Sequence, residues 1–291
     1  MSEWNRKFQR NAPRLSRPRR GWCLATDILL KTMPPAAFPS GALLDRRRCC
    51  LAALAGLTGL DGCTPLVKRP RDLQAAEIVR FSTARQQHGL PEGWYEQVMR
   101  RDLPTTRYRL VDLEGRRVMH ALADQSSSGL RCDVDIDPHA TPWLNWDWRV
   151  DQVASAATVA SDEFDDCPAR VALAFDGDLS MLTLRELWFR EQVALFTGHD
   201  LPFATLMYVW DGQAQPGSVF EYPRSGRIRY LVVEGGASHT GQWRRYRRNV
   251  VEDYRRVFGG EPGRIRSVGV LTDSDDLKIR NEAWYGDLVF S

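Results

Sequence analysis

The sequence predicts a mainly β protein, organised as one antiparallel β-sandwich with two inserted helices. Three observations support this prediction. From Leu90 onward, apolar and polar residues alternate over short segments, turn-forming residues separate the segments, and only two segments carry apolar residues at helical spacing. Because the strands follow one another without a helix after each, an antiparallel sandwich is favoured over alternating strand–helix units.

Two segments show the strand pattern most clearly. In Leu130–Asp137 the apolar residues, Cys132 among them, alternate with Arg and Asp. In Trp143–Asp151, Trp146 and Trp148 lie on the apolar face and are expected in the core. The other expected strands are Thr106–Leu113, Arg117–Ala123, Ala169–Phe175, Phe203–Trp210, Ile228–Val233, Ile265–Leu271 and Trp284–Phe290.

Two helices interrupt these strands. Thr183–Phe196 begins with Thr183 and Glu186 at the spacing of a capping box, and Gly198 follows its end. The second helix is expected over Arg247–Phe258. The first carries a stripe at helical spacing that is expected to face the core, formed by Leu184, Leu187, Trp188, Glu191, Ala194 and Leu195.

Charge is divided unevenly along the chain. Through Arg71 there are 14 basic residues against 4 acidic ones, and the remainder has 26 basic against 33 acidic. The basic character therefore belongs to the N-terminal segment, and the predicted sandwich is mildly acidic. Nucleic-acid binding needs a basic footprint on the folded domain, so we expect no nucleic-acid partner.

The N-terminal segment has the features of an export signal. Arg46-Arg47-Arg48 precedes a short apolar stretch from Cys49 to Leu60, which is too short to span a bilayer. Leu60-Asp61-Gly62-Cys63 resembles the cleavage box of a bacterial lipoprotein, whose cysteine carries the lipid. We therefore expect lipidation at Cys63 and a membrane-anchored location facing the periplasm, with plain secretion as the alternative.

These features divide the chain into three parts. Residues 1–62 are the expected leader, cleaved or disordered, and residues 1–32 are interpreted as an over-extended gene start. Residues 63–89 are the expected tether, and residues 90–291 the sandwich. Only Cys132 and Cys167 would remain as thiols in the exported domain, where they could form a disulfide; a buried, unpaired Cys132 is the alternative.

Several short motifs resemble one bacterial family in order and spacing. They are Trp146-Asp147-Trp148-Arg149-Val150, Asp165-Asp166, Ala169-Arg170-Val171, Phe175-Asp176-Gly177, Leu206-Met207-Tyr208-Val209-Trp210, Arg248-Asn249-Val250, Asp253-Tyr254, Phe258-Gly259, Thr272-Asp273-Ser274-Asp275 and Tyr285-Gly286-Asp287. This pattern is similar to the secreted proteobacterial family catalogued as domain of unknown function 3047. The resemblance covers about Leu90 to Phe290. It implies a jelly-roll sandwich similar to galactose-binding-like and carbohydrate-binding modules, without an established activity. Cys167 departs from the residue expected there, which indicates a local role such as a bridge to Cys132.

One polar strand face is the main candidate for ligand binding. Asp147 and Arg149 share it, and Arg170 and Asp176 are expected on a neighbouring strand. Charges of both signs among aromatic strands suit a network of sugar hydroxyls, and Trp210 is expected to be exposed for ring stacking. The alternative is an ion-pair network with a purely structural role.

A cation site is the second candidate. Asp273, Asp275 and Asp276 are closely spaced on one predicted loop, and Ca²⁺ prefers such oxygen ligands. Turn formation explains the same residues equally well. No other cofactor is indicated.

The sequence lacks the common catalytic motifs, so a saccharide-binding envelope protein without catalysis is the leading hypothesis. Two alternatives stay open. One is a glycan-active hydrolase or lyase using aspartates such as Asp165, Asp166 or Asp273. The other is an envelope scaffold without a small ligand.

Overall fold

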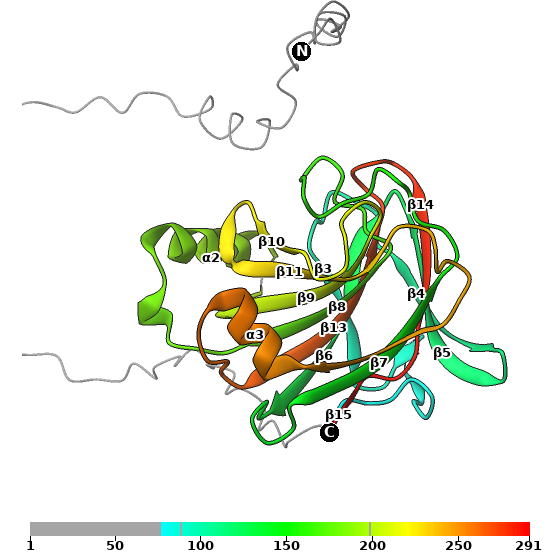
Figure 1. The fold of residues 1–291 in the computed structure, drawn as a ribbon, viewed down its shortest axis with the longest axis horizontal. Coiled ribbons are helices and arrows are strands. Elements are labelled where there is room, and N and C mark those ends of the chain that lie inside the picture. The colour runs from blue at the N-terminus through cyan, green and yellow to red at the C-terminus, as the bar shows by residue number, and fades with distance from the viewer. Residues whose placement is uncertain (1–76, 88, 198) are drawn as a thin grey trace, which may run out of the picture. The chain divides into compact units, whose positions relative to one another are not determined.

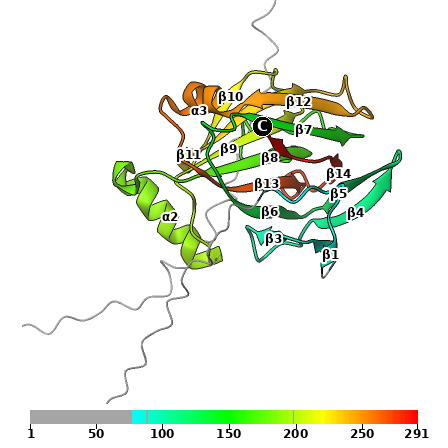
Figure 2. The ribbon, with the colours of Figure 1, turned by 90° about the horizontal axis from the view of Figure 1, so that it is seen from below.

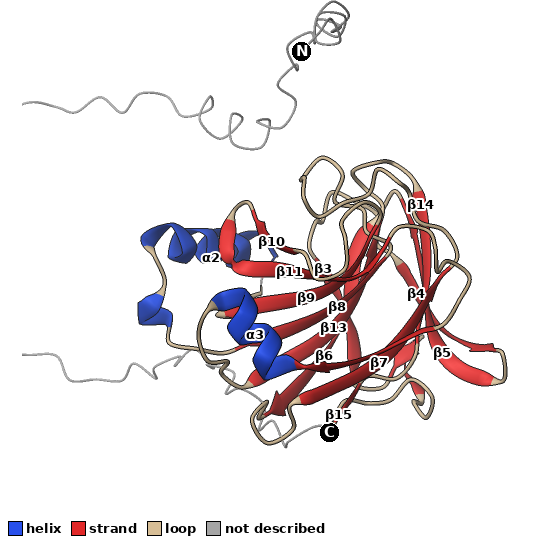
Figure 3. Ribbon diagram, viewed as in Figure 1, coloured by secondary structure: helices blue, strands red, loops and turns tan. Residues whose placement is uncertain are grey.

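The computed structural model describes residues 77–87, 89–197 and 199–291. The predicted leader, the over-extended start, Cys63 and the first part of the tether lie outside these residues. Two layers of strands form the body of the described domain, and both helices lie at one end of it (Figure 3). This confirms the mainly β sandwich with two helices that the sequence predicted.

The larger sheet has seven strands. Its order is β10 (Val219–Tyr222), β11 (Ser225–Gly235), β9 (Ala204–Asp211), β8 (Ala169–Phe175), β13 (Ile265–Asp273), β6 (Ser127–Ile136) and β3 (Trp94–Val98) (Figure 1). One pair departs from the predicted antiparallel arrangement: β11 runs parallel to β9, with Ile228 opposite Thr205. The short β10 returns the chain between them, so β11 can enter the sheet in the same direction as β9.

The smaller sheet has six strands. Its order is β12 (Arg244–Asn249), β7 (Trp143–Val150), β14 (Arg280–Tyr285), β5 (Arg116–Asp124) and β4 (Arg107–Leu113), and β15 (Val289–Phe290) also pairs with β7. Glu114-Gly115 forms the tight β4–β5 turn, in which both residues have positive φ. A separate two-stranded ribbon joins β1 (Gln86–Gln87) and β2 (Leu90–Pro91).

The predicted strand Trp284–Phe290 is split between β14 and β15. The break falls at Gly286, whose backbone N–H donates to the Asp147 carbonyl at 2.8 Å. A Cβ atom at Gly286 would lie 1.8 Å from Asp147 Oδ1, so only glycine allows this approach. The chain therefore leaves β14 and rejoins β7 as β15.

Both helices form close to their predicted positions. The capping box of α2 (Leu184–Thr197) is confirmed: the backbone N–H of Thr183 donates to Glu186 Oε2 at 2.8 Å. The expectation that its apolar stripe faces the core was wrong, because Leu184, Trp188 and Leu195 are exposed. A short 3-10 turn, η1 (Leu179–Met181), precedes α2.

The second helix, α3 (Val250–Phe258), begins three residues later than predicted. The preceding residues pair with β7 as β12, which places Arg244 to Arg248 on a strand. Asn249 then caps the helix by accepting from the N–H groups of Val251 and Glu252. Gly259 ends it with φ of 78°. Within the described residues, no helix is long and apolar enough to cross a membrane.

The core lies between the two sheets. Trp146 of β7 stacks on Tyr208 of β9 with ring centroids 4.9 Å apart, and Trp148 lies 6.4 Å from Trp210. The predicted core positions of Trp146 and Trp148 are thus confirmed. The folded domain also begins earlier than predicted, because Ile78 and Phe81 pack into this core. Ile78 and Phe81, which the sequence placed in the tether, therefore belong to the domain.

Candidate functional site

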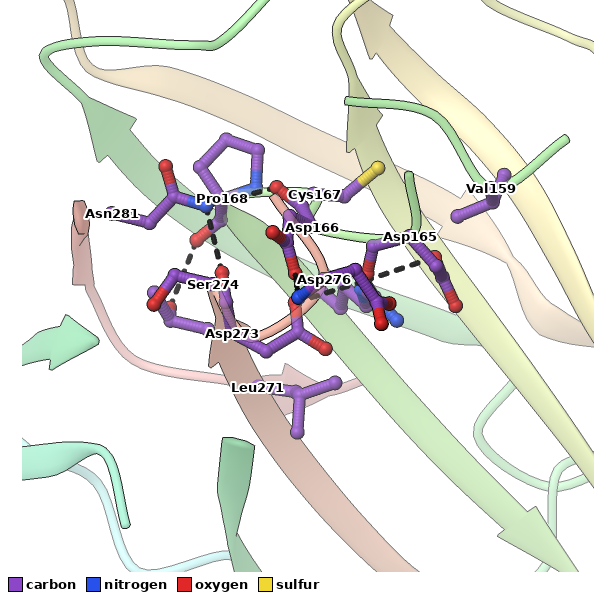
Figure 4. Close-up of polar contacts among 12 residues, drawn as sticks. Val159, Asp165, Asp166, Cys167, Pro168, Leu271, Asp273, Ser274, Asp276 and Asn281 are labelled. Atoms are coloured by element: carbon purple, nitrogen blue, oxygen red, sulfur yellow. Dashed lines mark hydrogen bonds and ion pairs between the residues drawn. The ribbon is translucent and has the colours of Figure 1, made fainter. Parts of the chain in front are cut away.

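Two loops bring acidic residues together at one end of the central strands of the seven-stranded sheet. β8 and β13 are antiparallel neighbours, so the loop before β8 meets the loop after β13. Figure 4 shows these loops facing one another, with Asp165 and Asp166 on one and Asp273 and Asp276 on the other. We call this group the carboxylate cluster; it comprises Asp165, Asp166, Asp273, Asp275, Asp276 and the guanidinium of Arg170.

Arg170 holds the buried part of the cluster. Its Nη2 lies 3.1 Å from Asp165 Oδ1 and 2.9 Å from Asp273 Oδ1, and its side chain is only 3% exposed. Tyr230 donates its hydroxyl to Asp165 Oδ2 at 3.3 Å. Burial raises the pKa of Asp165 to about 6, against the opposing charge of Arg170. One guanidinium serves two carboxylates here, so full ionisation of both is unfavourable.

The second part of the cluster is formed by Asp166, Asp275 and Asp276, of which only Asp276 is partly exposed. Asp166, Asp275 and Asp276 each place a carboxylate oxygen within 4.8 Å of the others. Backbone N–H groups of Asp276 and Leu277 donate to the two oxygens of Asp166, at 3.1 and 2.5 Å. Burial, together with the charges of Asp275 and Asp166, raises the pKa of Asp276 to about 7. A bound cation would relieve this repulsion.

These three carboxylates are the residues of the cluster that could hold a metal ion. The sequence predicted Asp273, Asp275 and Asp276 as the cation ligands. The structure groups Asp166 with the last two and turns Asp273 toward Arg170 instead. Three hard oxygen ligands suit Ca²⁺, and further coordination positions would need water or backbone carbonyls.

The polar face of β7 forms a second, separate region. Its inward residues fill the core, so Asp147 and Arg149 point to the opposite side of the smaller sheet. Asp147 Oδ2 lies 2.6 Å from Arg116 Nη1, and Arg149 pairs with Glu114 and Asp151 at 2.7 Å each. We call this side of the smaller sheet the outer face.

Three tryptophans, all partly exposed, share the outer face. Trp284 stacks on His120 with centroids 5.1 Å apart, and Arg149 lies 5.8 Å from the Trp284 ring centre. The Arg116 guanidinium carbon lies 3.7 Å from the Trp243 ring centre, and the Arg247 guanidinium carbon lies 3.8 Å from the Trp143 ring centre. The outer face therefore combines indole rings, cations and carboxylates within one sheet surface.

The structure does not bring the five predicted ligand contacts together. Asp147 and Arg149 lie on the smaller sheet, whereas β8 and β13 of the larger sheet place Arg170 in the carboxylate cluster. Asp176 pairs with Arg266 at 2.6 Å at the opposite end of β8. The expected exposure of Trp210 was wrong: its ring is fully buried, and Nε1 donates to the Gly236 carbonyl. β7 and β8 belong to different sheets, which sequence alternation could not reveal.

Other residues of these regions were not among the ligand contacts predicted from the sequence. The alternation of β14 places Asn281, Ala283 and Tyr285 inward, so Trp284 lies on the outer face. That alternation was the available signal. No comparable signal marked His120 or Tyr230.

Cys132 and Cys167 are both buried free thiols. Cys132 is opposite Val268 of β13, which is in turn opposite Leu173 of β8. Cys167 lies six residues before Leu173, a separation of ~20 Å along the strand direction. The structure therefore contradicts the predicted bridge and supports the alternative of a buried, unpaired Cys132.

Sequence comparison assigns the chain to a family. Residues 92–289 match the family described as "Protein of unknown function (DUF3047)". The chain belongs to this family. The match confirms the resemblance seen in the motifs from Trp146 to Asp287, and no curated protein matches the sequence.

Solved structures with a similar chain path include two glycan-related proteins. Trichoderma harzianum endoglucanase 3 from family GH12 is 11% identical with a TM-score of 0.32, covering 64% of this chain and 85% of that chain. The xyloglucanase domain of NopAA, a type three effector from Sinorhizobium fredii in complex with cellobiose, is 10% identical with a TM-score of 0.32, covering 65% and 92%. Likenesses of this size carry no conclusion about activity.

Proposed function

We propose that this chain is an exported, lipid-anchored envelope protein that binds a saccharide on the outer face without catalysing its conversion. The observation that carries the proposal is the presence of Trp143, Trp243 and Trp284 on one sheet surface, beside cations and carboxylates. Indole rings stack on the apolar faces of sugar rings, and charged side chains hydrogen-bond their hydroxyls.

The ion pairs of the outer face fit this role. Arg149 already bridges Glu114 and Asp151, and Glu114 also accepts from Trp243 Nε1 at 2.9 Å. These contacts hold the polar groups in fixed positions before a ligand arrives, which lowers the cost of ordering them on binding. A guanidinium over an exposed ring is worth only about 0.5–1 kcal/mol, so a sugar can displace it.

Binding should be tested on the full-length chain with a glycan array followed by calorimetry. Trp284→Ala is expected to weaken binding by about ten-fold or more, because an aromatic platform is lost. Trp188→Ala is the matched control, since Trp188 is an exposed tryptophan on α2, away from the outer face. The absence of binding to any array glycan, or equal loss in both variants, would remove this proposal.

The anchor needs a separate test. The lipoprotein-type box ending at Cys63 supports lipidation. Mass spectrometry of the mature protein should find a diacylated N-terminal cysteine, and Cys63→Ser should release the protein from the membrane fraction. An unmodified Cys63 in a cleaved, soluble protein would favour plain secretion.

A glycan-active hydrolase or lyase is the second candidate. It is favoured by the raised pKa values of Asp165 and Asp276, about 6 and about 7, because such carboxyls can exchange protons near neutral pH. The burial of Asp166, Asp273 and Asp275 opposes it, because only Asp165 and Asp276 of the five carboxylates are partly exposed to a polysaccharide. Turnover of a polysaccharide that vanishes in a folded Asp276→Asn variant would promote this candidate.

A further inference from the structure

Helix α2 exposes its more apolar side. Leu184, Trp188 and Leu195 are 86%, 65% and 80% exposed, and Met181 of η1 is 68% exposed. The spacing of the three helical residues places them on one side of the helix. Figure 2 shows α2 projecting from the end of the sandwich. Large apolar side chains grouped in this way on a protein surface mark an interaction site.

Specific contacts hold the helix in this rotation. On the inward side, Glu186 Oε1 lies 3.3 Å from Arg227 Nε, and Leu187 packs on the core. Glu186 also accepts from Thr183 in the capping box. The polar Glu186 is therefore turned toward the protein, while the apolar residues face out.

A basic pocket adjoins the first turn of α2. It encloses about 400 Å³ between this turn and the β10–β11 turn. Its charged lining is Arg185, Glu186, Glu221, Arg224, Arg227 and Arg229. Two guanidiniums are balanced, Arg227 by Glu186 and Arg229 by Glu221 at 2.8 Å.

Two positive charges of this pocket are left uncompensated. Arg185 donates to the Pro223 carbonyl, and no carboxylate among the described residues forms an ion pair with Arg185 or Arg224. Both side chains are exposed. Met181 and Thr183 line the same pocket, so the positive charge lies directly beside the start of the apolar stripe.

We propose that α2 docks on a membrane surface that carries anionic lipids. Met181, Leu184, Trp188 and Leu195 enter the boundary between headgroups and acyl chains, as interfacial amphipathic helices do. Arg185 and Arg224 take lipid phosphates in or beside the basic pocket. The combination of an apolar stripe with adjacent unpaired cations fits anionic lipid better than a second apolar protein surface. Glu191 lies on the same side of the helix and opposes docking on a negative surface.

This inference deepens the proposed envelope location but requires neither lipid on Cys63 nor a sugar on the outer face. Docking would orient the domain, because α2 and the outer face carry different residues and can act at the same time. The two proposals can therefore fail independently.

Vesicle co-sedimentation of full-length Cys63→Ser protein provides the test. Any binding of the basic leader to anionic vesicles is common to every variant, so differences between variants report on α2. With vesicles of phosphatidylcholine and phosphatidylglycerol, the Leu184→Glu/Trp188→Glu variant should bind at least about ten-fold more weakly. Arg224→Gln should bind about five-fold more weakly. Glu191→Gln should bind more tightly.

Two comparisons separate docking through α2 from a general effect of added or removed charge. Met99→Glu, which changes an exposed apolar residue elsewhere, should bind like the parent protein. On vesicles of phosphatidylcholine alone, Arg224→Gln should match the parent, because each phosphate is balanced by a choline ammonium and the surface carries no net negative charge. Equal binding of the Leu184→Glu/Trp188→Glu variant and the parent would overturn the proposal. The proposal would also be overturned if the parent protein formed a dimer and the double substitution dissociated it without changing vesicle binding. That result would identify α2 as a contact between copies of the chain.

Discussion

The carboxylate cluster and the outer face both place guanidinium groups between carboxylates, but in opposite surroundings. The Arg170 side chain is 3% exposed, and the side chains of its partners Asp165 and Asp273 are 18% and 8% exposed. The Arg149 side chain is 20% exposed, and its partners Glu114 and Asp151 are about half exposed. Similar pair distances therefore correspond to very different energies, because water screens one set and not the other.

This difference separates two roles for charge in one domain. In the carboxylate cluster, desolvation raises the pKa of Asp165 and Asp276. The same charged groups link two loops where β8 begins and β13 ends. On the outer face, Arg149 and its partners Glu114 and Asp151 remain partly exposed to a ligand from solvent, whereas Asp147 is buried. We therefore expect mutations in the cluster to change stability, and mutations on the outer face to change binding.

The largest expected effect is on stability at Arg170. Arg170→Met should lower the free energy of unfolding by about 3–5 kcal/mol, because Asp165 and Asp273 would be left buried without a cation. Arg149→Met should cost less than about 1 kcal/mol. Urea unfolding of the full-length protein measures both, and equal losses would contradict the distinction between the two regions.

The pH dependence should give the next largest effect. The pKa values of Asp165 and Asp276 are raised in the folded state above the unfolded value of about 3.8–3.9, so the folded protein binds more protons between about pH 4 and 7. Stability should therefore fall as pH rises through this window, by less than the Arg170 substitution costs, because water screens the partly exposed Asp276.

Thermal unfolding, measured in steps of about half a pH unit from about pH 4.5 to about pH 7.5, follows this change. Asp276→Asn should flatten the upper part of the profile, because its neutral amide cannot lose a proton. Asp151→Asn, on the outer face, should keep the parent slope. A profile that rises with pH in the parent protein would show that the cluster is fully ionised in the folded state.

Calcium should have the smallest of the three effects. If Ca²⁺ binds Asp166, Asp275 and Asp276 only in the folded state, a ten-fold excess over Kd should add about 1.4 kcal/mol and raise Tm by about 3–6 °C. Calorimetry with and without a chelator measures the shift. The shift should disappear in Asp276→Asn and persist in Asp151→Asn, and an identical shift in all three proteins would indicate non-specific salt stabilisation.

Sequence patterns identified the strands and helices where one face is buried and the other is solvated. Alternation in Leu130–Asp137 and Trp143–Asp151 predicted β6 and β7 within a few residues. The last three residues of β12, 247–249, were assigned to the second helix. Their strand conformation comes from pairing with β7, which is a tertiary contact.

The candidate site was predictable only in part, for a related reason. Asp165, Asp166 and the loop from Asp273 to Asp276 were recognised as acidic, but nothing local indicated that they meet. Their contact depends on β8 lying beside β13, about a hundred residues away in the chain. The same limitation placed Asp147 and Arg170 on one surface when they belong to different sheets.

The position of β13 and β14 has a consequence for the order of folding. β13 lies between β6 and β8 in one sheet, and β14 lies between β5 and β7 in the other. Both come from residues 265–285, near the C-terminus, so the earlier strands have incomplete neighbours until this segment is available. Such long-range pairing slows folding and leaves strand edges open during synthesis. A chain ending before Ile265 should therefore aggregate instead of forming a smaller sandwich.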